Sequence, residues 1–542
     1  SSGQFNPGAA PAPELLPPSG APAPSLAPSF DPSYNSPPWN TFGPPKSAHL
    51  FAAPPIISYA TSNGGSLDLE DAHAVVGAPV SSGGYILAGK AMECADHCAS
   101  GRRANTSEGF AVKMGVHGEQ VWGWRSDLPG AHDAINGAVE LPSGDILIAG
   151  WRTVGGVGKR ALTKLNGQDG TEMWTFAGFG DAAGAHGAIE LLTMIGTTDV
   201  LLSGLKEKPD AHGMQFKSYG NAAGGKAWLA KMTVLALSSR TTPPALSDIT
   251  WQTTEADYMT CKAAIAHPDG SIAALLWGED SIDKSAGLVV YNRTSPQSQG
   301  GGYSTVWGPM DYGEANNLEG TDIAVSADGT KIAMTGHGGH LATGKDYSGK
   351  LVIVDLHTGD VLSTTEITGG GTSEIIYNEC FGVAAMSDGG FVVACGNGIE
   401  GCDHVSDANK SACAQGQGDL SAPGMKFEAG LWVSMAAKFN AAGQLVWKRS
   451  AALRAHGSAA CDLCTNFTAR SSSASEWVIA NKDGSLAYVQ DESDGFGVML
   501  LGTGSGGTGE GGPLSPAPSG SHLSAPSGSI SAPSTLNTGH HP

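Results

Sequence analysis

The sequence lacks several features that would place it in a common functional class. No run of 18 or more apolar residues occurs, so we expect no membrane-spanning segment. Lys and Arg number 30 against 51 Asp and Glu, and the resulting net charge of −21 argues against nucleic-acid or anionic-membrane partners. The motifs Gly-x-Ser-x-Gly and His-Glu-x-x-His and the phosphate-binding loop are missing too. We therefore predict no catalytic residues and expect the protein not to be an enzyme.

Proline is scarce where a sheet protein would exclude it. Only ten prolines lie between Ile56 and Gly502, whereas the whole chain has 31. Proline removes a ladder hydrogen bond, so its scarcity favours strands in this region. The chain also has 78 Gly and only 15% charged residues, which is typical of a turn-rich β protein.

One phrase recurs along the chain: an apolar strand, a polar turn and a second strand containing Trp. Its clearest copy is residues 161–174, which end on Trp174. The copies that begin at Lys113 and Lys438 also keep Gly-x-x-x-Trp, and residues 354–362 have the same turn with Ser363 where Trp would fall. Looser copies end at Trp251 and Trp307. Such repetition indicates repeated supersecondary units.

Hairpin-turn signals give the number of units. There are seven, each followed by a short apolar run: Ser82-Gly83-Gly84, Ser143-Gly144-Asp145, Gly196-Thr197-Thr198, Asp269-Gly270, Asp328-Gly329, Asp388-Gly389 and Asp483-Gly484. Each unit has the pattern of four strands, so we predict an all-β, seven-bladed β-propeller over residues 49–502. The last unit lacks a fourth strand after residues 497–501. We expect residues 56–60 to supply it and close the ring.

The recurring phrase resembles the tryptophan-docking motif of quinoprotein-type β-propellers, on residues 161–174 and 354–362. The resemblance implies the propeller fold. Quinoprotein dehydrogenases usually have eight blades and an adjacent cysteine pair near their cofactor. This chain has seven predicted blades and no adjacent cysteines, so no catalytic residue is carried over. We expect no cofactor.

Two low-complexity segments flank the predicted propeller. Residues 1–48 hold 13 prolines and three charged residues, which favours an extended arm. Aromatic residues interrupt the arm, and we expect four of them to mediate assembly: Phe30, Tyr34, Trp39 and Phe42. Residues 503–542 form a Gly-, Ser- and Pro-rich tail with Glu510 as its only charge. The repeated Ser-Pro and Ala-Pro steps resemble hydroxyproline-rich wall glycoproteins of plants and green algae, which implies proline hydroxylation and O-linked sugar.

Four sequons predict N-glycosylation in expected loops or turns: Asn105, Asn292, Asn409 and Asn466. The chain begins Ser1-Ser2-Gly3, which is compatible with a removed signal peptide. We therefore expect a secreted or cell-surface protein.

Nine cysteines are compatible with an oxidising compartment. Three close pairs fall in expected loops, where we predict local disulfides rather than metal sites: Cys94 with Cys98, Cys402 with Cys413, and Cys461 with Cys464. Cys380 and Cys395 flank a hairpin turn, so they either bridge its strands or are small buried residues. Cys261 is expected to be left over.

Long insertions are expected mainly on the propeller face that holds the connections between blades, at residues 92–108, 206–226, 396–429 and 452–474. Three Ala-His steps, at His73, His132 and His186, are expected near the same face. They could hold a metal ion, or they could simply be polar loop ends. Residues 491–494 could bind calcium but lack EF-hand spacing, so a solvated turn is the other interpretation.

We therefore expect a secreted structural glycoprotein that assembles with itself into an extracellular filament or surface layer. In this hypothesis the Pro-rich arm docks on a neighbouring propeller. One alternative is a propeller that binds carbohydrate or protein. A quinoprotein-like oxidoreductase is the least favoured.

Overall fold

The structure, a computed structural model, describes sixteen stretches of the chain. They are residues 56–62, 70–92, 107–115, 119–126, 133–209, 224–267, 269–278, 285–294, 302–338, 348–368, 377–399, 417–418, 426–427, 431–451, 473–492 and 495–502. The Pro-rich arm (1–48) and the tail (503–542) lie outside them, so their predicted extended conformations stay predictions.

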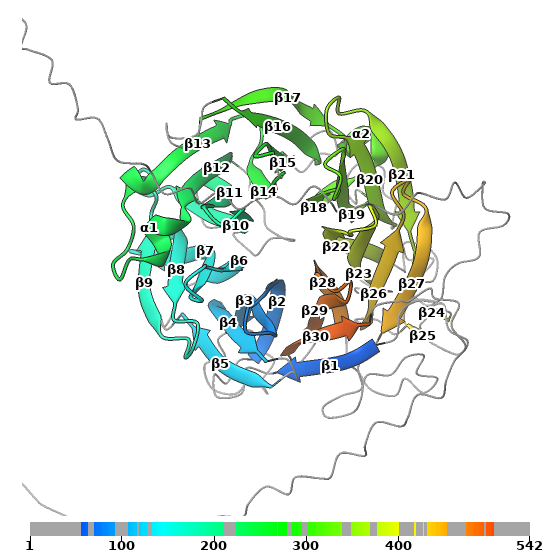
Figure 1. The fold of residues 1–542 in the computed structure, drawn as a ribbon, viewed down its shortest axis with the longest axis horizontal. Coiled ribbons are helices and arrows are strands. Elements are labelled where there is room, and N and C mark those ends of the chain that lie inside the picture. Colours follow the sequence, from blue (N-terminus) through cyan, green and yellow to red (C-terminus); the bar gives the residue numbers. More distant parts are fainter. Residues whose placement is uncertain are drawn as a thin grey trace, which may run out of the picture. The chain divides into compact units, whose positions relative to one another are not determined.

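Seven four-stranded antiparallel sheets surround a common centre, as Figure 1 shows. The first three blades, each from inner to outer strand, are β2 (Glu70–Pro79), β3 (Tyr85–Met92), β4 (Ser107–Met114) and β5 (Gln120–Arg125); β6 (Ala134–Glu140), β7 (Ile146–Val154), β8 (Val157–Leu165) and β9 (Glu172–Ala177); and β10 (His186–Ile195), β11 (Asp199–Lys208), β12 (Lys226–Thr233) and β13 (Ile249–Glu255). The short helices α1 (Val234–Ser238) and η3 (Leu246–Asp248) lie between β12 and β13.

The other four blades have the same order. They are β14 (Thr260–Ala266), β15 (Ile272–Trp277), β16 (Gly287–Arg293) and β17 (Tyr303–Asp311); β18 (Glu319–Val325), β19 (Lys331–His337), β20 (Gly349–Asp355) and β21 (Val361–Ile367); β22 (Tyr377–Ala385), β23 (Phe391–Ile399), β26 (Leu431–Phe439) and β27 (Leu445–Ala451); and β28 (Ser473–Ala480), β29 (Leu486–Glu492), β30 (Gly495–Leu501) and β1 (Ile56–Ser62). Helix α2 (Gly313–Asn316) follows β17, and the short pair β24 (Gln417–Gly418) and β25 (Lys426–Phe427) lies between β23 and β26.

The seventh blade closes the ring as the sequence predicted. β1 pairs antiparallel with β30, from Ile56 opposite Leu501 to Ser62 opposite Phe496. The closing strand is two residues longer than predicted, because Thr61 and Ser62 continue the ladder. In Figure 1, β1 lies on the outer edge of the ring beside β30. The first and last described strands are therefore neighbours in one sheet. Because β1 covers the outer edge of β30, β30 has a partner on both sides.

The second and third strands of the blades are apolar on both faces. In β7, for example, six successive residues from Ile146 to Trp151 are buried. Successive side chains on a strand point to opposite faces, so a strand buried on both sides must lie between two neighbouring blades. The outermost strands differ, because β5 has only Trp122 and Trp124 buried and β9 only Trp174. This gradient from inner to outer strand confirms the predicted seven-bladed propeller.

The recurring Lys and Trp are directly opposite each other on the third and fourth strands. Lys113 pairs with Trp122, and Lys164 pairs with Trp174. In each case both side chains donate hydrogen bonds to one carbonyl of the next blade: Gly167 O receives bonds of 2.7 Å from Lys113 and 3.2 Å from Trp122. Arg240 O receives bonds of 3.4 Å from Lys164 and 3.3 Å from Trp174. The phrase thus joins neighbouring blades.

Ser363 stands at the corresponding place in the fifth blade. It pairs with Ile353, and a Cβ atom added to Gly443 of the sixth blade would lie 2.3 Å from Ser363 Oγ. The smaller side chain still packs on the turn of the next blade. This placement agrees with the alignment of residues 354–362 with the Trp-containing copies.

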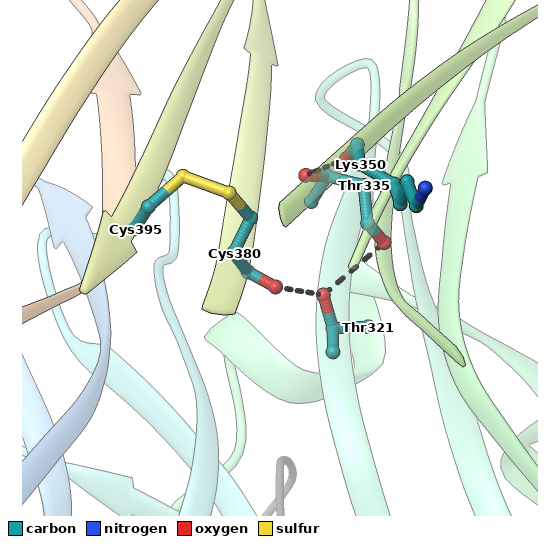
Figure 2. Close-up of a disulfide and its surroundings, with 5 residues drawn as sticks. All are labelled: Thr321, Thr335, Lys350, Cys380 and Cys395. Carbon is teal, nitrogen blue, oxygen red and sulfur yellow. Dashed lines mark hydrogen bonds between the residues drawn. A yellow bond between two sulfur atoms is a disulfide. The ribbon is translucent and has the colours of Figure 1, made fainter. Parts of the chain in front are cut away.

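The first two strands of the sixth blade are joined by a disulfide between Cys380 and Cys395, drawn in Figure 2. The two residues are cross-strand partners on β22 and β23. Thr321 Oγ1 of the fifth blade donates to Cys380 O at 2.9 Å, so the same point also links two blades (Figure 2). Cys261 is a buried free thiol, as expected. The six cysteines of the three close pairs lie outside the described residues.

No helix in the described stretches is long and apolar enough to cross a membrane.

Candidate functional site

The inner strand of every blade carries a β-bulge near its start. The residue at the bulge has no ladder partner, and its type varies among the blades: Val75, Asn136, Glu190, Lys262, Thr321, Phe381 and Glu476. A bulge re-aims its side chain and is often found beside functional sites. The start of an inner strand and the end of the second strand lie at the same end of the blade. In Figure 1 the inner strands surround the centre of the ring.

Five ionisable side chains gather at this end of the inner and second strands, across the third to sixth blades. We call them the inner cluster: Glu190 on β10, Lys262 on β14, Glu319 on β18, His337 on β19 and Glu379 on β22. Four of the five residues are buried, with exposed fractions of 5% to 8%; Glu319 is partly buried. Buried charges are costly unless they are paired, so such a group needs mutual compensation.

The centre of the inner cluster is the pair of His337 and Glu319. His337 Nε2 lies 3.3 Å from Glu319 Oε2, and the two residues are cross-strand partners. Burial by itself lowers the pKa of His337, but the charge of Glu379 and the hydrogen bond to Glu319 together outweigh it. The pKa of His337 is therefore raised above its usual 6.5. This shift favours the imidazolium, which offsets part of the carboxylate charge.

Lys262 joins the third blade to the fifth. Its ammonium lies 5.2 Å from the centre of the Trp277 ring, within the range of a cation–π contact. Burial lowers the pKa of Lys262, whereas the charges of Glu190 and Glu319 act to raise it, and burial prevails. Lys262 is thus a buried amine held between two carboxylates of neighbouring blades.

Asn397 lies on β23 close to Glu379. It pairs across the strands with Asn378, and its residue is 0% exposed. Neither the oxygen nor the nitrogen of its side-chain amide has a hydrogen-bond partner among the described residues. Cys395, two residues earlier, packs in a core cluster with Leu351 of the fifth blade, and strand alternation places Asn397 on that same face. The amide therefore faces the blade that carries His337.

The inner cluster has more carboxylates than basic groups. Three carboxylates face one amine and one imidazole, which suits a polar or cationic group. The nearby thiol of Cys261 is unsuited to attack, because burial, with the charges of Glu190 and Glu255, raises its pKa well above the usual value. No group of three His, Cys, Asp or Glu residues in the described stretches has the arrangement of a metal site.

Two of the three histidines of the Ala-His steps, His73 and His186, lie in the described strands. His73 pairs with Lys90 on β3. His186 begins β10, and its Nδ1 accepts a hydrogen bond of 3.0 Å from the backbone of Gly158, which gives it a structural role. His132 lies outside the described residues, as do Ser493 and Asp494 of the possible calcium turn.

Of the four sequons, only the one at Asn292 lies in the described chain. Asn292 was expected in a loop, but it lies in β16, where it pairs with Ser304. That part of the prediction is wrong, because the hairpin of β16 and β17 continues past the register shift at Trp307. Asn292 is exposed all the same. The sequons at Asn105, Asn409 and Asn466 and the four arm aromatics lie outside the described residues.

The sequence analysis did not find the inner cluster. Four of its members are charged residues on inner strands, such as Glu190 in Ala-Ile-Glu-Leu-Leu and Lys262 in Thr-Cys-Lys-Ala-Ala, and His337 lies on a second strand. A charge that interrupts a buried inner strand, as Glu190 and Lys262 do, was the available signal.

Fold and geometry together define the class of protein: a seven-bladed β-propeller with four-stranded blades. No protein-family model matches the chain, and no curated protein matches it. Several solved structures are similar. Sqt1 from Chaetomium thermophilum, bound to the N-terminus of ribosomal protein L10, has 11% identity and a TM-score of 0.37, covering 83% of this chain and 99% of that one.

BamB from Moraxella catarrhalis has 10% identity and a TM-score of 0.37, covering 83% of this chain and 100% of that one. The Dos1 propeller has 8% identity and a TM-score of 0.38, covering 82% and 94% of the two chains. Likenesses at this level say nothing about what this chain binds.

Proposed function

We propose that the protein is a secreted structural glycoprotein that assembles with copies of itself through its Pro-rich arm. The observation that carries the proposal is the completeness of the ring. All seven blades have four strands, and every one of these strands comes from residues 56–502. Residues 1–48 are therefore not needed to complete the propeller.

The two low-complexity segments join the ring at one place. Ile56, the first residue of β1, is the cross-strand partner of Leu501, the last residue of β30. The arm and the tail therefore continue from the same end of the same blade. A propeller chain that begins and ends in one blade suits a subunit whose flanking segments reach toward a neighbour.

Two further observations support export from the cell. The disulfide between Cys380 and Cys395 lies in the core of the sixth blade, and buried disulfides persist mainly in oxidising compartments. The sequon at Asn292 presents an exposed Asn on the surface, where a glycan can be attached. Proline hydroxylation and O-linked sugar in the flanking segments belong to the same proposal.

The test is removal of residues 1–48 from the protein produced in a secretory host. We expect the truncated chain to keep a folded propeller but to lose its polymers in electron microscopy. Undiminished assembly of the truncated chain would refute the arm as the assembly element. Mass spectrometry of the native peptides tests export separately, because unmodified Asn292 and unmodified prolines throughout would contradict it.

A second candidate function is the binding of a cationic group at the inner cluster. The excess of carboxylates and the unpartnered amide of Asn397 favour it. Titration of the intact protein with an arginine-rich peptide tests this candidate. Binding that weakens in Glu319→Gln and Glu379→Gln supports it, and equal binding by these variants refutes it.

A further inference from the structure

Exposed apolar side chains concentrate on two neighbouring outer strands. Seven large apolar side chains are exposed in the described chain, and four of them lie on β17 and β21: Val306, Met310, Val361 and Leu362. Their exposed fractions are 53%, 40%, 46% and 51%. We call these four residues the rim patch. Figure 1 shows β17 and β21 on the outer edge of the ring, in adjacent blades.

The two halves of the rim patch are held together by contacts between the blades. Trp307 Nε1 donates to Leu356 O at 2.8 Å, and Tyr312 Oη donates to Gly359 O at 2.6 Å. A Cβ atom added to Gly359 would lie 2.8 Å from Met310 Sδ, so Met310 rests on the turn that leads into Val361. These contacts hold Met310 of the fourth blade against the turn of the fifth blade that precedes Val361.

Both strands are also the last in their sheets. β17 and β21 each pair with one strand only, so one edge of each is unpaired in the described structure. Pro309 in β17 removes a backbone donor from the strand, which discourages pairing with another sheet edge. An extended segment with apolar side chains suits such a surface, because it buries the patch without needing a continuous strand ladder.

We propose that the rim patch is the acceptor for the Pro-rich arm of a second copy of this chain. The arm has aromatic residues at Phe30, Tyr34, Trp39 and Phe42 and only three charges in 48 residues. It can therefore cover four apolar side chains without burying charge, although the whole protein carries a net charge of −21. The proposal rests on the proposed function and names the surface that this function requires.

The arm is taken from a second copy because the proposed function is self-assembly. The arm continues from Ile56 on the seventh blade, whereas the rim patch lies on the fourth and fifth blades. In Figure 1, β1 and β17 occupy opposite edges of the ring. A root on one edge and an acceptor across the ring make a heterologous contact, which propagates as a filament unless rotation closes it.

The experiment uses the full-length chain with a photo-cross-linking amino acid in place of Leu362, and a matched chain with it in place of Val121. Val121 is equally exposed, at 49%, and lies on the outer strand β5 of the first blade. Unlabelled and 15N-labelled copies are mixed before assembly, so that the cross-linked peptides report whether the arm and the patch come from one chain or two.

We expect cross-links from position 362 to residues 28–48, in mixed-label peptides, at least tenfold more abundant than those from position 121. Cross-linked peptides of a single label would show that the chain's own arm occupies the patch. Equal yields at positions 362 and 121 would show that the arm has no preference for the patch. Either result overturns the inference. If the arm is required for polymers but does not cross-link at position 362, the proposed function stands and this acceptor is wrong.

Discussion

The indole of Trp122 lies against Gly170 of the next blade. A Cβ atom added to Gly170 would come within 2.7 Å of the ring carbon Cε3. Gly170 also has a φ of +75°, which side chains other than glycine's rarely tolerate. The recurring Gly and Trp of this sequence are thus the two halves of one contact between blades.

We predict that Gly170→Ala destabilises the propeller more than Gly144→Ala does. Gly144 has a φ of +83° but nothing within 4 Å of its added Cβ, so its replacement costs only the backbone strain of about 1 kcal/mol. Gly170→Ala adds overpacking against Trp122, which costs roughly 1–3 kcal/mol more. Urea unfolding measures both, and equal losses would contradict the docking role of Gly170.

Ring closure makes a prediction about truncation. Removal of residues 1–62 deletes β1 and exposes the edge of β30, so we expect a lower melting temperature and aggregation. Removal of residues 1–48 leaves β1 intact and serves as the control, with an unchanged melting temperature. A chain without residues 1–62 that melts like the intact protein would show that β1 is dispensable.

The disulfide between Cys380 and Cys395 should stabilise the fold measurably. The bridge joins residues 15 apart. Closing a loop of this length lowers the entropy of the unfolded chain and so raises its free energy by about 3 kcal/mol. We expect the double variant Cys380→Ser and Cys395→Ser to lose roughly that free energy of unfolding. Cys261→Ser is the control, because Cys261 takes no part in a bridge. Addition of a reductant should lower the stability of the wild type by more than that of the double variant.

His337 should make stability depend on pH. Its pKa is raised in the folded state, because the charge of Glu379 and the hydrogen bond to Glu319 outweigh the effect of burial. A raised folded-state pKa stabilises the protein below the unfolded value of about 6.5, and this contribution is lost as pH rises through the folded-state value.

In the wild type, we expect the free energy of unfolding to fall as pH rises above about 6.5. In His337→Gln, we expect this fall to be smaller. Urea unfolding of both proteins at pH 6 and pH 8.5 provides the measurement. Parallel pH profiles for the two proteins would mean that His337 keeps one protonation state throughout this window.

The sequence by itself determined the fold of this protein, because each unit is specified locally. An Asp-Gly turn fixes a hairpin, and an apolar run on either side of it fixes two buried strands. The absence of a fourth strand after β30 also predicted that the N-terminal strand, now seen as Ile56–Ser62, would close the ring.

Only the tertiary structure decided where the chemistry of the protein lies. Glu190, Lys262 and Glu379 belong to three different blades, and nothing in the local sequence around each one predicts the others. The ring brings them together because β10, β14 and β22 are each the inner strand of their blade. The rim patch has the same origin: Met310 and Val361 are surface residues of separate strands, and they form one surface only because the turn at Gly359 docks on the neighbouring blade.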